Sequence, residues 1–151
     1  MHIKLLLQIP HIPGHIRESD EKIKNSYIVY AREGRKCFMP HTMQTLLAGY
    51  IKEVQKIYGA HLKSVILYGS YARGDYKADS DIDIMILLDL SDMDIKQYRH
   101  ELSGETFDFN MDHELDIKPI AKSQQYFQNW VDVYPFYANV KKEGVKLFDA
   151  A

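Results

Sequence analysis

The hydrophobic pattern is clearest from residue 42 onward, where it begins with a helix. Between residues 42 and 58, apolar and tyrosine side chains recur at helical spacing, and lysine, glutamate and glutamine occupy the opposite face. Thr42 is expected to cap the first turn, and Gly59 to follow the last residue. The pattern predicts an amphipathic helix that packs against a core, with its tyrosines in the core and at its rim.

Two apolar runs separated by a polar loop follow this helix. The first run ends abruptly at Gly69-Ser70, and ten residues separate that turn from Asp81-Ile82-Asp83 at the head of the second run. Because successive side chains of a strand point to opposite faces, Asp81 and Asp83 share one face while Ile82 lies on the other. The pattern predicts a strand, a tight turn, a polar loop and a second strand that carries two carboxylates.

More helices and strands are expected towards the C-terminus. A capping serine followed by acidic residues indicates a helix that begins at Ser91. Alternation predicts a strand over residues 114–120, and Pro119 places its end near a sheet edge. The remaining expected elements are short helices over residues 123–131 and 135–144 and a final strand over residues 145–148. This order predicts the α+β class, with a small β-sheet and helices packed mainly on one face.

Residues 1–41 are less informative and are interpreted as an N-terminal extension of uncertain structure. Proline and glycine interrupt its first part. Residues 19–32 suit a helix, yet residues 26–34 equally suit the opening of a hairpin, and both alternatives stay open. His11 and His15 are four residues apart, but the proline and glycine between them disfavour a metal-binding helix face.

Composition and charge narrow the class of protein. A chain of 151 residues is long enough for one domain with a real core. The net charge of −2 argues against binding by bulk phosphate neutralisation, so direct nucleic-acid binding is not expected. The single cysteine, Cys37, excludes an intramolecular disulfide and fits a reducing compartment. No apolar run approaches the length of a membrane span, so we expect no membrane segment and a cytoplasmic location.

Asp81 and Asp83 create a charge repulsion that a cation would relieve. Two like charges held side by side on a strand are costly unless something cationic lies between them. A third carboxylate, Asp116, lies on the predicted strand over residues 114–120, and it would join them if that strand lay alongside. Three such acids either titrate together with raised pKa values or bind one or two Mg²⁺ ions. Magnesium in such a site keeps positions for substrate phosphates, which indicates phosphoryl or nucleotidyl transfer.

The Gly69-Ser70 turn supplies groups that suit the phosphates of a nucleotide. Glycine lets the backbone approach a phosphate closely, and Ser70 can present its N–H and its hydroxyl at the start of a short helical turn. Arg73 can add a fixed positive charge to the same phosphates. Taken alone, a Gly-Ser pair is usually a turn, an Asp-x-Asp pair a solvated strand edge, and Arg73 a solubilising loop residue. Their conjunction in fixed order, at the ends of two apolar strands, indicates a nucleotide site.

This arrangement resembles the nucleotidyltransferase superfamily related to DNA polymerase beta. The resemblance is carried by Gly69-Ser70, by Ala72-Arg73-Gly74 in the gap, and by Asp81-x-Asp83. The form Ser80-Asp81-Ile82-Asp83 is similar to that of the minimal, MNT-type members, and Asp116 in Leu115-Asp116-Ile117 occupies the place of the family's third acid. The resemblance covers residues 42–151, which are interpreted as a minimal nucleotidyltransferase domain.

The resemblance implies a fold, a reaction and roles for the residues. It implies a mixed βαβ palm, two Mg²⁺ ions and transfer of a nucleoside monophosphate, usually AMP from ATP, to a hydroxyl. By the same likeness, Asp81 and Asp83 would hold both metals, and Asp116 would hold the catalytic metal and help to remove the hydroxyl proton. Gly69 and Ser70 would bind the β- and γ-phosphates.

The resemblance also implies a protein partner. Minimal members are often antitoxins paired with a HEPN-domain RNase toxin, and some inactivate it by adenylylating a tyrosine. The first hypothesis is therefore an active nucleotidyltransferase that modifies such a toxin. The second is an antitoxin that only binds, based on aromatic residues that can lie at the surface: Tyr126, Trp130, Tyr134 and Tyr137. A small-molecule adenylyltransferase is a third possibility, because no residue identifies the acceptor.

Overall fold

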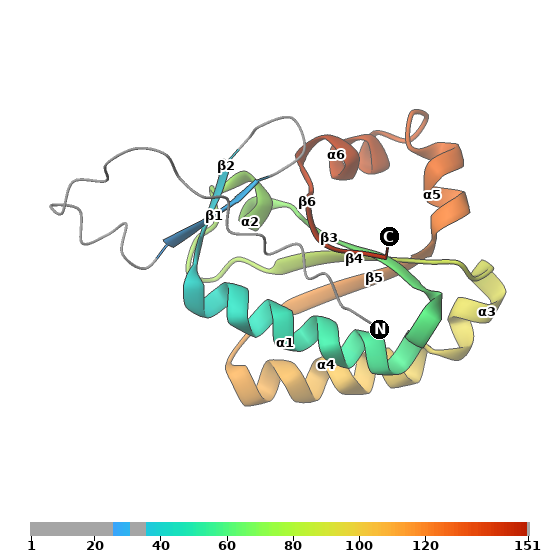
Figure 1. Ribbon diagram of the computed structural model, residues 1–151, viewed down its shortest axis with the longest axis horizontal. Coiled ribbons are helices and arrows are strands. Elements are labelled where there is room, and N and C mark those ends of the chain that lie inside the picture. The colour runs from blue at the N-terminus through green and yellow to red at the C-terminus, as the bar shows by residue number, and fades with distance from the viewer. Residues whose placement is uncertain (1–25, 31–35, 151) are drawn as a thin grey trace, which may run out of the picture.

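A four-stranded mixed sheet forms the centre of the chain in the computed structural model, which describes residues 26–30 and 36–150 (Figure 1). The strand order is β5-β4-β3-β6; β3 is antiparallel to both of its neighbours, and β4 is parallel to β5. The strands are β3 (Leu62–Tyr68), β4 (Ile82–Leu88), β5 (Ile117–Ser123) and β6 (Val145–Asp149). The predicted α+β class with a small mixed sheet is confirmed.

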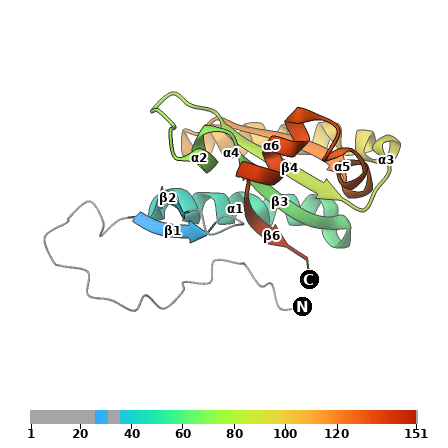
Figure 2. The same ribbon diagram turned by 90° about the horizontal axis from the view of Figure 1, so that it is seen from above.

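Helices cover both faces of this sheet. The two long helices, α1 (His41–Tyr58) and α4 (Arg99–His113), lie side by side on one face, and α5 (Gln124–Trp130) and α6 (Pro135–Glu143) lie on the other (Figures 1 and 2). The short elements are η2 (Gly59–His61), α2 (Ser70–Arg73) and α3 (Asp92–Gln97). Among the described residues, no helix is long and apolar enough to cross a membrane.

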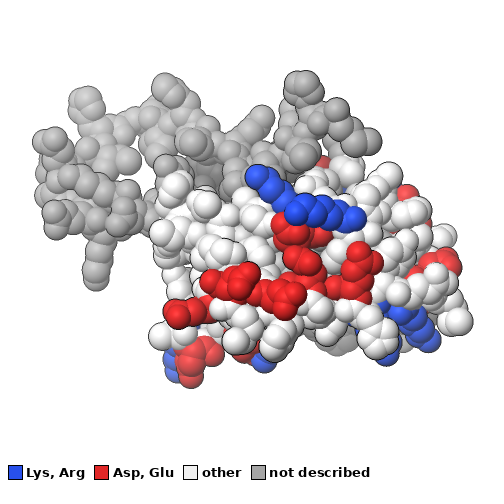
Figure 3. Space-filling view, turned by 90° about the horizontal axis from the view of Figure 1, so that it is seen from below, with Lys and Arg blue, Asp and Glu red and all other residues white. Residues whose placement is uncertain are grey.

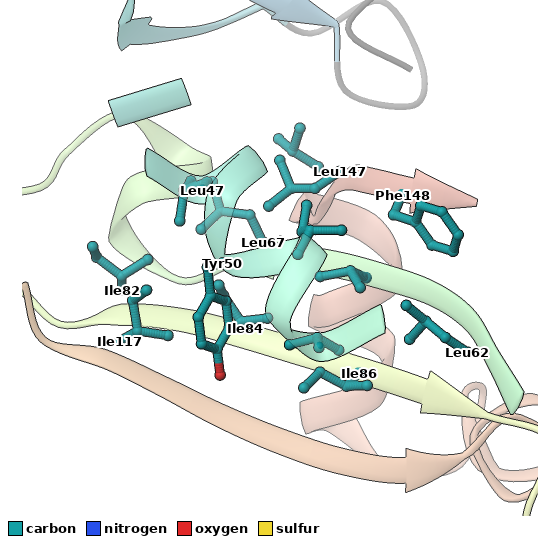
Figure 4. Packing of buried hydrophobic residues seen from close by; sticks show 14 of the residues in the cluster. Leu47, Tyr50, Leu62, Leu67, Ile82, Ile84, Ile86, Ile117, Leu147 and Phe148 are labelled. Atoms are coloured by element: carbon teal, nitrogen blue, oxygen red, sulfur yellow. The ribbon is translucent and has the colours of Figure 1, made fainter. Parts of the chain in front are cut away.

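The larger core lies between the sheet and the two long helices. Alternate residues of β4, such as Ile84 and Ile86, point into it, where they meet Leu67 of β3 and Tyr50 of α1 (Figure 4). The Tyr50 hydroxyl is also buried, and its partner is the Thr106 hydroxyl of α4 at 2.7 Å. This hydrogen bond satisfies both polar groups inside an apolar core and ties α1 to α4.

The intervening residues of β4 form a smaller core on the opposite face. Met85 and Leu87 pack there with Phe127 of α5 and Val140 of α6. Because Asp83 precedes Met85 by two residues, it lies on this second face, as the strand alternation predicts. The long apolar strand thus packs on both faces, and only its first residues carry charge.

The outer face of α4 is acidic, whereas α1 beside it carries Lys52, Glu53 and Lys56. Figure 3 shows acidic side chains gathered in a band across this face, with basic side chains beside it. The acids of α4 are Glu101, Glu105, Asp108 and Asp112. Nucleic-acid backbones bind to basic surfaces, so this face is unsuited to them.

Two details of the first long helix can be compared with the sequence prediction. Gly59 does follow its last residue, with a φ of 55°. The prediction that Thr42 caps its start is wrong, because the helix begins at His41 directly after Pro40, and no side chain caps it. Proline fixes its own φ and has no N–H to satisfy, so the change from strand to helix occurs two residues earlier than the cap pattern indicated, at Pro40 instead of Thr42.

The start of β5 also differs from the prediction, which placed a strand over residues 114–120. The strand begins at Ile117, because α4 continues to His113 and Glu114 ends it in a left-handed conformation with a φ of 53°. The short segment before Ile117 alternates as a strand does, but in the structure it is the connection between the end of α4 and the start of β5. The expected edge position of Pro119 is confirmed, since β5 is the outermost strand on its side of the sheet.

Part of the N-terminal segment forms a hairpin. Strands β1 (Ser26–Tyr30) and β2 (Lys36–Pro40) pair antiparallel, with Ser26 opposite Pro40. Of the two alternatives left open by the sequence, the hairpin is therefore the one observed. His11 and His15 lie outside the described residues.

The packing of β4 predicts a large cost for a cavity in the main core. Ile84 is fully buried. We expect Ile84→Ala to lower the free energy of unfolding by about 2–5 kcal/mol, measured by urea denaturation, because the lost packing is not refilled. The control is Val133→Ala, whose side chain is 60% exposed and which should change stability by less than about 0.5 kcal/mol. Equal effects of the two substitutions would contradict this packing.

Candidate functional site

The residues singled out in the sequence gather at one end of the sheet. Gly69 follows β3 directly, Asp83 is the second residue of β4, and Asp81 and Asp116 immediately precede β4 and β5. Parallel strands begin at the same end of a sheet, and an antiparallel neighbour ends there. The register agrees, because Tyr68 is paired with Asp83, and Asp83 with Lys118.

Gly69 is required at its position by both conformation and space. Its φ of 72° and ψ of −153° belong to a region that residues with a side chain rarely adopt. A Cβ at this position would also overlap the carboxylate of Asp83, lying 3.2 Å from its Cγ. The turn can therefore pass closely over Asp83 only because it is glycine, and α2 begins at the next residue, Ser70.

The loop between α2 and β4 is held by local contacts. The rings of Tyr71 and Tyr76 stack with centroids 4.2 Å apart and nearly parallel planes. Further along, the Ser80 hydroxyl accepts a hydrogen bond from the Lys77 N–H at 2.8 Å, which forms a turn just before Asp81. These contacts fix the direction in which the chain enters β4.

Arg73 lies beside this loop but pairs with carboxylates. Its guanidinium lies 3.3 Å from Asp75 and 3.4 Å from Glu143 at the end of α6. Burial raises the pKa of the Asp83 carboxyl, and the positive charge of Arg73, like that of Lys118, acts to lower it. The assignment of Arg73 to substrate phosphates remains a prediction.

Asp116 is positioned from two sides. The N–H of Ile82 donates a hydrogen bond of 2.9 Å to the Asp116 carbonyl, which joins the starts of the two strands. From α4, the Asn110 side chain accepts from the Ile117 N–H at 2.9 Å and donates to the Ile117 carbonyl at 3.1 Å. The amide of Asn110 thus pairs with the first residue of β5 as a neighbouring strand would.

A lysine that the sequence reasoning did not assign occupies the space between two of the acids. The Lys118 ammonium lies 2.8 Å from the Asp81 carboxylate and 3.7 Å from that of Asp116. Strand alternation could have indicated this residue, since Lys118 is two positions after Asp116 and so lies on the same face. What the sequence could not supply is the register that places Lys118 beside Asp81.

The surroundings move the pKa values of the two β4 carboxyls in opposite directions. The hydrogen bond from Lys118 is the main reason that the pKa of Asp81 lies below its usual range. Burial raises the pKa of Asp83, and the negative charge of Asp81 raises it further. The pKa of the Lys118 ammonium is in turn raised by Asp81. The site therefore favours a cation next to Asp81.

The donor atoms of this site suit a magnesium ion. The three aspartates offer only oxygen ligands, which Mg²⁺ prefers, and the Lys118 ammonium already lies in the position of a cation between two of them. In the described part of the chain, however, no three His, Cys, Asp or Glu side chains converge closely enough to hold an ion. The predicted ligands share one end of the sheet, and the Lys118 side chain, which is 55% exposed, has room to turn away.

Comparison with known proteins shows that most of this chain matches a known family. Residues 47–146 match the family described as "Nucleotidyltransferase domain". Two proteins of Methanocaldococcus jannaschii, both named putative protein adenylyltransferase, are similar in sequence. One is 33% identical over 66% of this chain and 91% of its own length, and the other is 28% identical over 58% and 86%.

A solved structure supports the fold. The crystal structure of a putative nucleotidyltransferase from Sulfolobus solfataricus aligns with a TM-score of 0.50 over 72% of this chain and 81% of its own, at 21% identity. At that identity the likeness concerns the arrangement of strands and helices alone.

The close approach of Gly69 and Asp83 can be tested by a double-mutant cycle. Gly69→Ala should cost more free energy of unfolding than Gly59→Ala, because both glycines have a positive φ but Gly59 has open space around its Cβ position. Strain at either position is of order 1–3 kcal/mol. In an Asp83→Ala background, the cost of Gly69→Ala should fall to that of Gly59→Ala, measured by urea denaturation. A cost that is the same in both backgrounds would show that the carboxylate does not limit this turn.

Proposed function

Because the chain belongs to the nucleotidyltransferase domain family, we propose that it transfers AMP from ATP to a hydroxyl group of a partner protein. That it is a nucleotidyltransferase follows from the family match over residues 47–146 and from the relatives named as adenylyltransferases. The nucleotide, the ion and the acceptor are parts of the proposal. The observation that carries it is that Asp81, Asp83 and Asp116 lie at the same end of the sheet as the Gly69-Ser70 turn.

The proposed roles of the residues follow from where they lie. Gly69 would let the β- and γ-phosphates reach the backbone, and Ser70 would donate its N–H and hydroxyl to them. Asp81, Asp83 and Asp116 would hold Mg²⁺. The ion, when bound, would neutralise charge on the triphosphate and on the departing pyrophosphate. Lys118 would then leave its place between the carboxylates.

The proposed transfer is an in-line substitution at phosphorus. The acceptor oxygen forms a bond to the α-phosphorus, the bond from that phosphorus to the bridging β-phosphate oxygen breaks, and pyrophosphate leaves. Asp116, whose side chain is 59% exposed, would accept the hydroxyl proton from an acceptor that arrives from solvent.

A protein acceptor is supported by the names of the relatives and by the motif. Both Methanocaldococcus jannaschii relatives are named as protein adenylyltransferases, and Ser80-Asp81-Ile82-Asp83 is similar to the MNT form. We propose a tyrosine of a HEPN-type toxin as the acceptor, with this chain as the antitoxin. The acidic outer face of α4 speaks against a nucleic-acid acceptor on that side (Figure 3).

Neutralisation by binding alone is the second candidate, and it is favoured by one observation. Of the aromatic residues named for it, Trp130 and Tyr134 are 38% and 44% exposed, so they can contact a partner, whereas Tyr137 is buried in the smaller core. Such a surface would serve a catalytic antitoxin equally well. The carboxylates distinguish the two functions, because binding alone does not need them.

Asparagine substitution tests the chemistry. With α-labelled ATP, Mg²⁺ and the co-expressed partner, wild-type protein should transfer label, and Asp81→Asn should lower the rate by at least about 100-fold because a metal ligand is lost. The matched control is Asp108→Asn on the outer face of α4, which should transfer at the wild-type rate. Transfer that is unchanged in Asp81→Asn would disprove the catalytic role. Protection of cells by a folded Asp81→Asn, Asp83→Asn variant would favour the binding function.

Removal of the lysine between the carboxylates tests the cation site without any nucleotide. Lys118→Met should tighten Mn²⁺ binding by up to about fivefold, the range of an exposed ion pair, because the ion no longer competes with an ammonium. Binding is measured by the electron paramagnetic resonance signal of free Mn²⁺. The control is Lys122→Met, on the same strand and face, whose ammonium lies over the Tyr126 ring instead. Affinity that is equal in Lys118→Met and wild type would refute the competition.

A further inference from the structure

An exposed aromatic side chain lies next to the candidate site but has no role in the proposed transfer. Phe136, in the first turn of α6, is 44% exposed. Its ring meets that of Tyr68 edge to face, with centroids 5.6 Å apart and planes at 83°. Large apolar side chains usually bury themselves, so one that stays exposed beside a polar site suits an apolar part of a ligand.

Tyr68 connects this ring directly to the groups assigned to phosphate and ion. It is the last residue of β3, immediately before Gly69, and it is paired with Asp83 across the two strands. Directly opposed residues of an antiparallel pair project to the same face, so the Tyr68 ring lies beside the Asp83 carboxylate. Its hydroxyl stays protonated, since burial and the charge of Asp83 raise its pKa to about 12.

The position of Phe136 is fixed by the packing of α6. Its neighbours Tyr137 and Val140 are buried against the sheet together with Ile66 of β3. At the other end of the helix, Glu143 reaches Arg73 of α2 at 3.4 Å. Helix α6 therefore lies over β3 beside α2 (Figures 1 and 2). The ring contact with Tyr68 keeps Phe136 next to the residue that precedes Gly69.

We propose that Tyr68 and Phe136 form the subsite for the base of the nucleotide, an inference that rests on the proposed function. A nucleoside triphosphate carries its phosphates and its base at opposite ends of one ribose. Tyr68 directly precedes Gly69, so phosphates bound at Gly69-Ser70 would leave the base within reach of the ring pair. Aromatic rings bind bases by stacking, which needs no particular pattern of hydrogen bonds. The subsite would therefore take purines of either kind, with less affinity for the smaller pyrimidines.

The other exposed apolar side chains are less well placed to contact the base of a nucleotide. Among the described residues, Phe107 and Met111 belong to α4 on the opposite face, and Met93 belongs to α3. Ile120 of β5 is the rival, because it is 36% exposed and lies two residues after Lys118 on the site face. It offers no ring, so it would support a base by contact alone.

The test compares ATP with tripolyphosphate, which has the phosphates but no base. Titration calorimetry of the full chain with Mg²⁺ should show that Phe136→Leu weakens ATP binding by about tenfold, the value of one stacked base, with tripolyphosphate affinity unchanged. Phe136→Trp should restore ATP binding and give a fluorescence change with ATP alone. Phe107→Leu is the matched control, since Phe107 is 64% exposed but belongs to α4 on the opposite face, and this variant should bind both ligands normally.

Each contrary outcome has a defined meaning. Unchanged ATP binding in Phe136→Leu, or equal loss of ATP and tripolyphosphate, would overturn the subsite. So would a loss specific to ATP in Ile120→Ala that is absent in Phe136→Leu, because the base would then lie over β5. Failure of wild-type protein to bind either ligand would overturn the proposed function as well. If Phe136→Leu keeps ATP affinity but loses the partner protein, the ring belongs to a docking surface instead.

Discussion

The parallel pairing of β4 with β5 brings the candidate site together. Since both strands begin at the same end of the sheet, the residues before them, Asp81 and Asp116, become neighbours, joined by the hydrogen bond from Ile82 to the Asp116 carbonyl at 2.9 Å. The antiparallel strand β3 ends at the same place and delivers Gly69. The rest of β4 is buried on both faces, so the burial of apolar side chains holds together charged groups that would otherwise separate.

The Lys118 ammonium offsets part of the negative charge of the carboxylates at this end of the sheet. Asp81 has a lowered pKa beside Lys118, and Asp83, which is more buried, has a raised one. Two carboxyls separated by one residue are thus unequal before any ligand arrives. The inequality comes from position, because Asp81 lies just outside the strand while Asp83 lies within it, under the Gly69 turn.

Local patterns in the sequence predicted those parts of the structure that depend on neighbouring residues. The alternation around Asp81 and Asp83 and the tight turn at Gly69 need only a few residues of context. The start of β5 was misplaced because the end of α4 at Glu114 has no distinctive signal. Lys118 was missed for another reason: its role depends on a register between strands distant in the chain, which no local pattern contains.

The side-chain amide of Asn110 has a consequence for the fidelity of strand pairing. A strand that slips by one residue turns every side chain to the opposite face. For β5, such a slip would place an apolar neighbour where Lys118 stands and would turn Asp116 towards α4. Asn110 engages both the N–H and the carbonyl of Ile117 in the observed alignment, so a slip of the strand would have to break both hydrogen bonds. The Asn110 side chain of α4 thereby disfavours slippage of β5, the strand that completes the site.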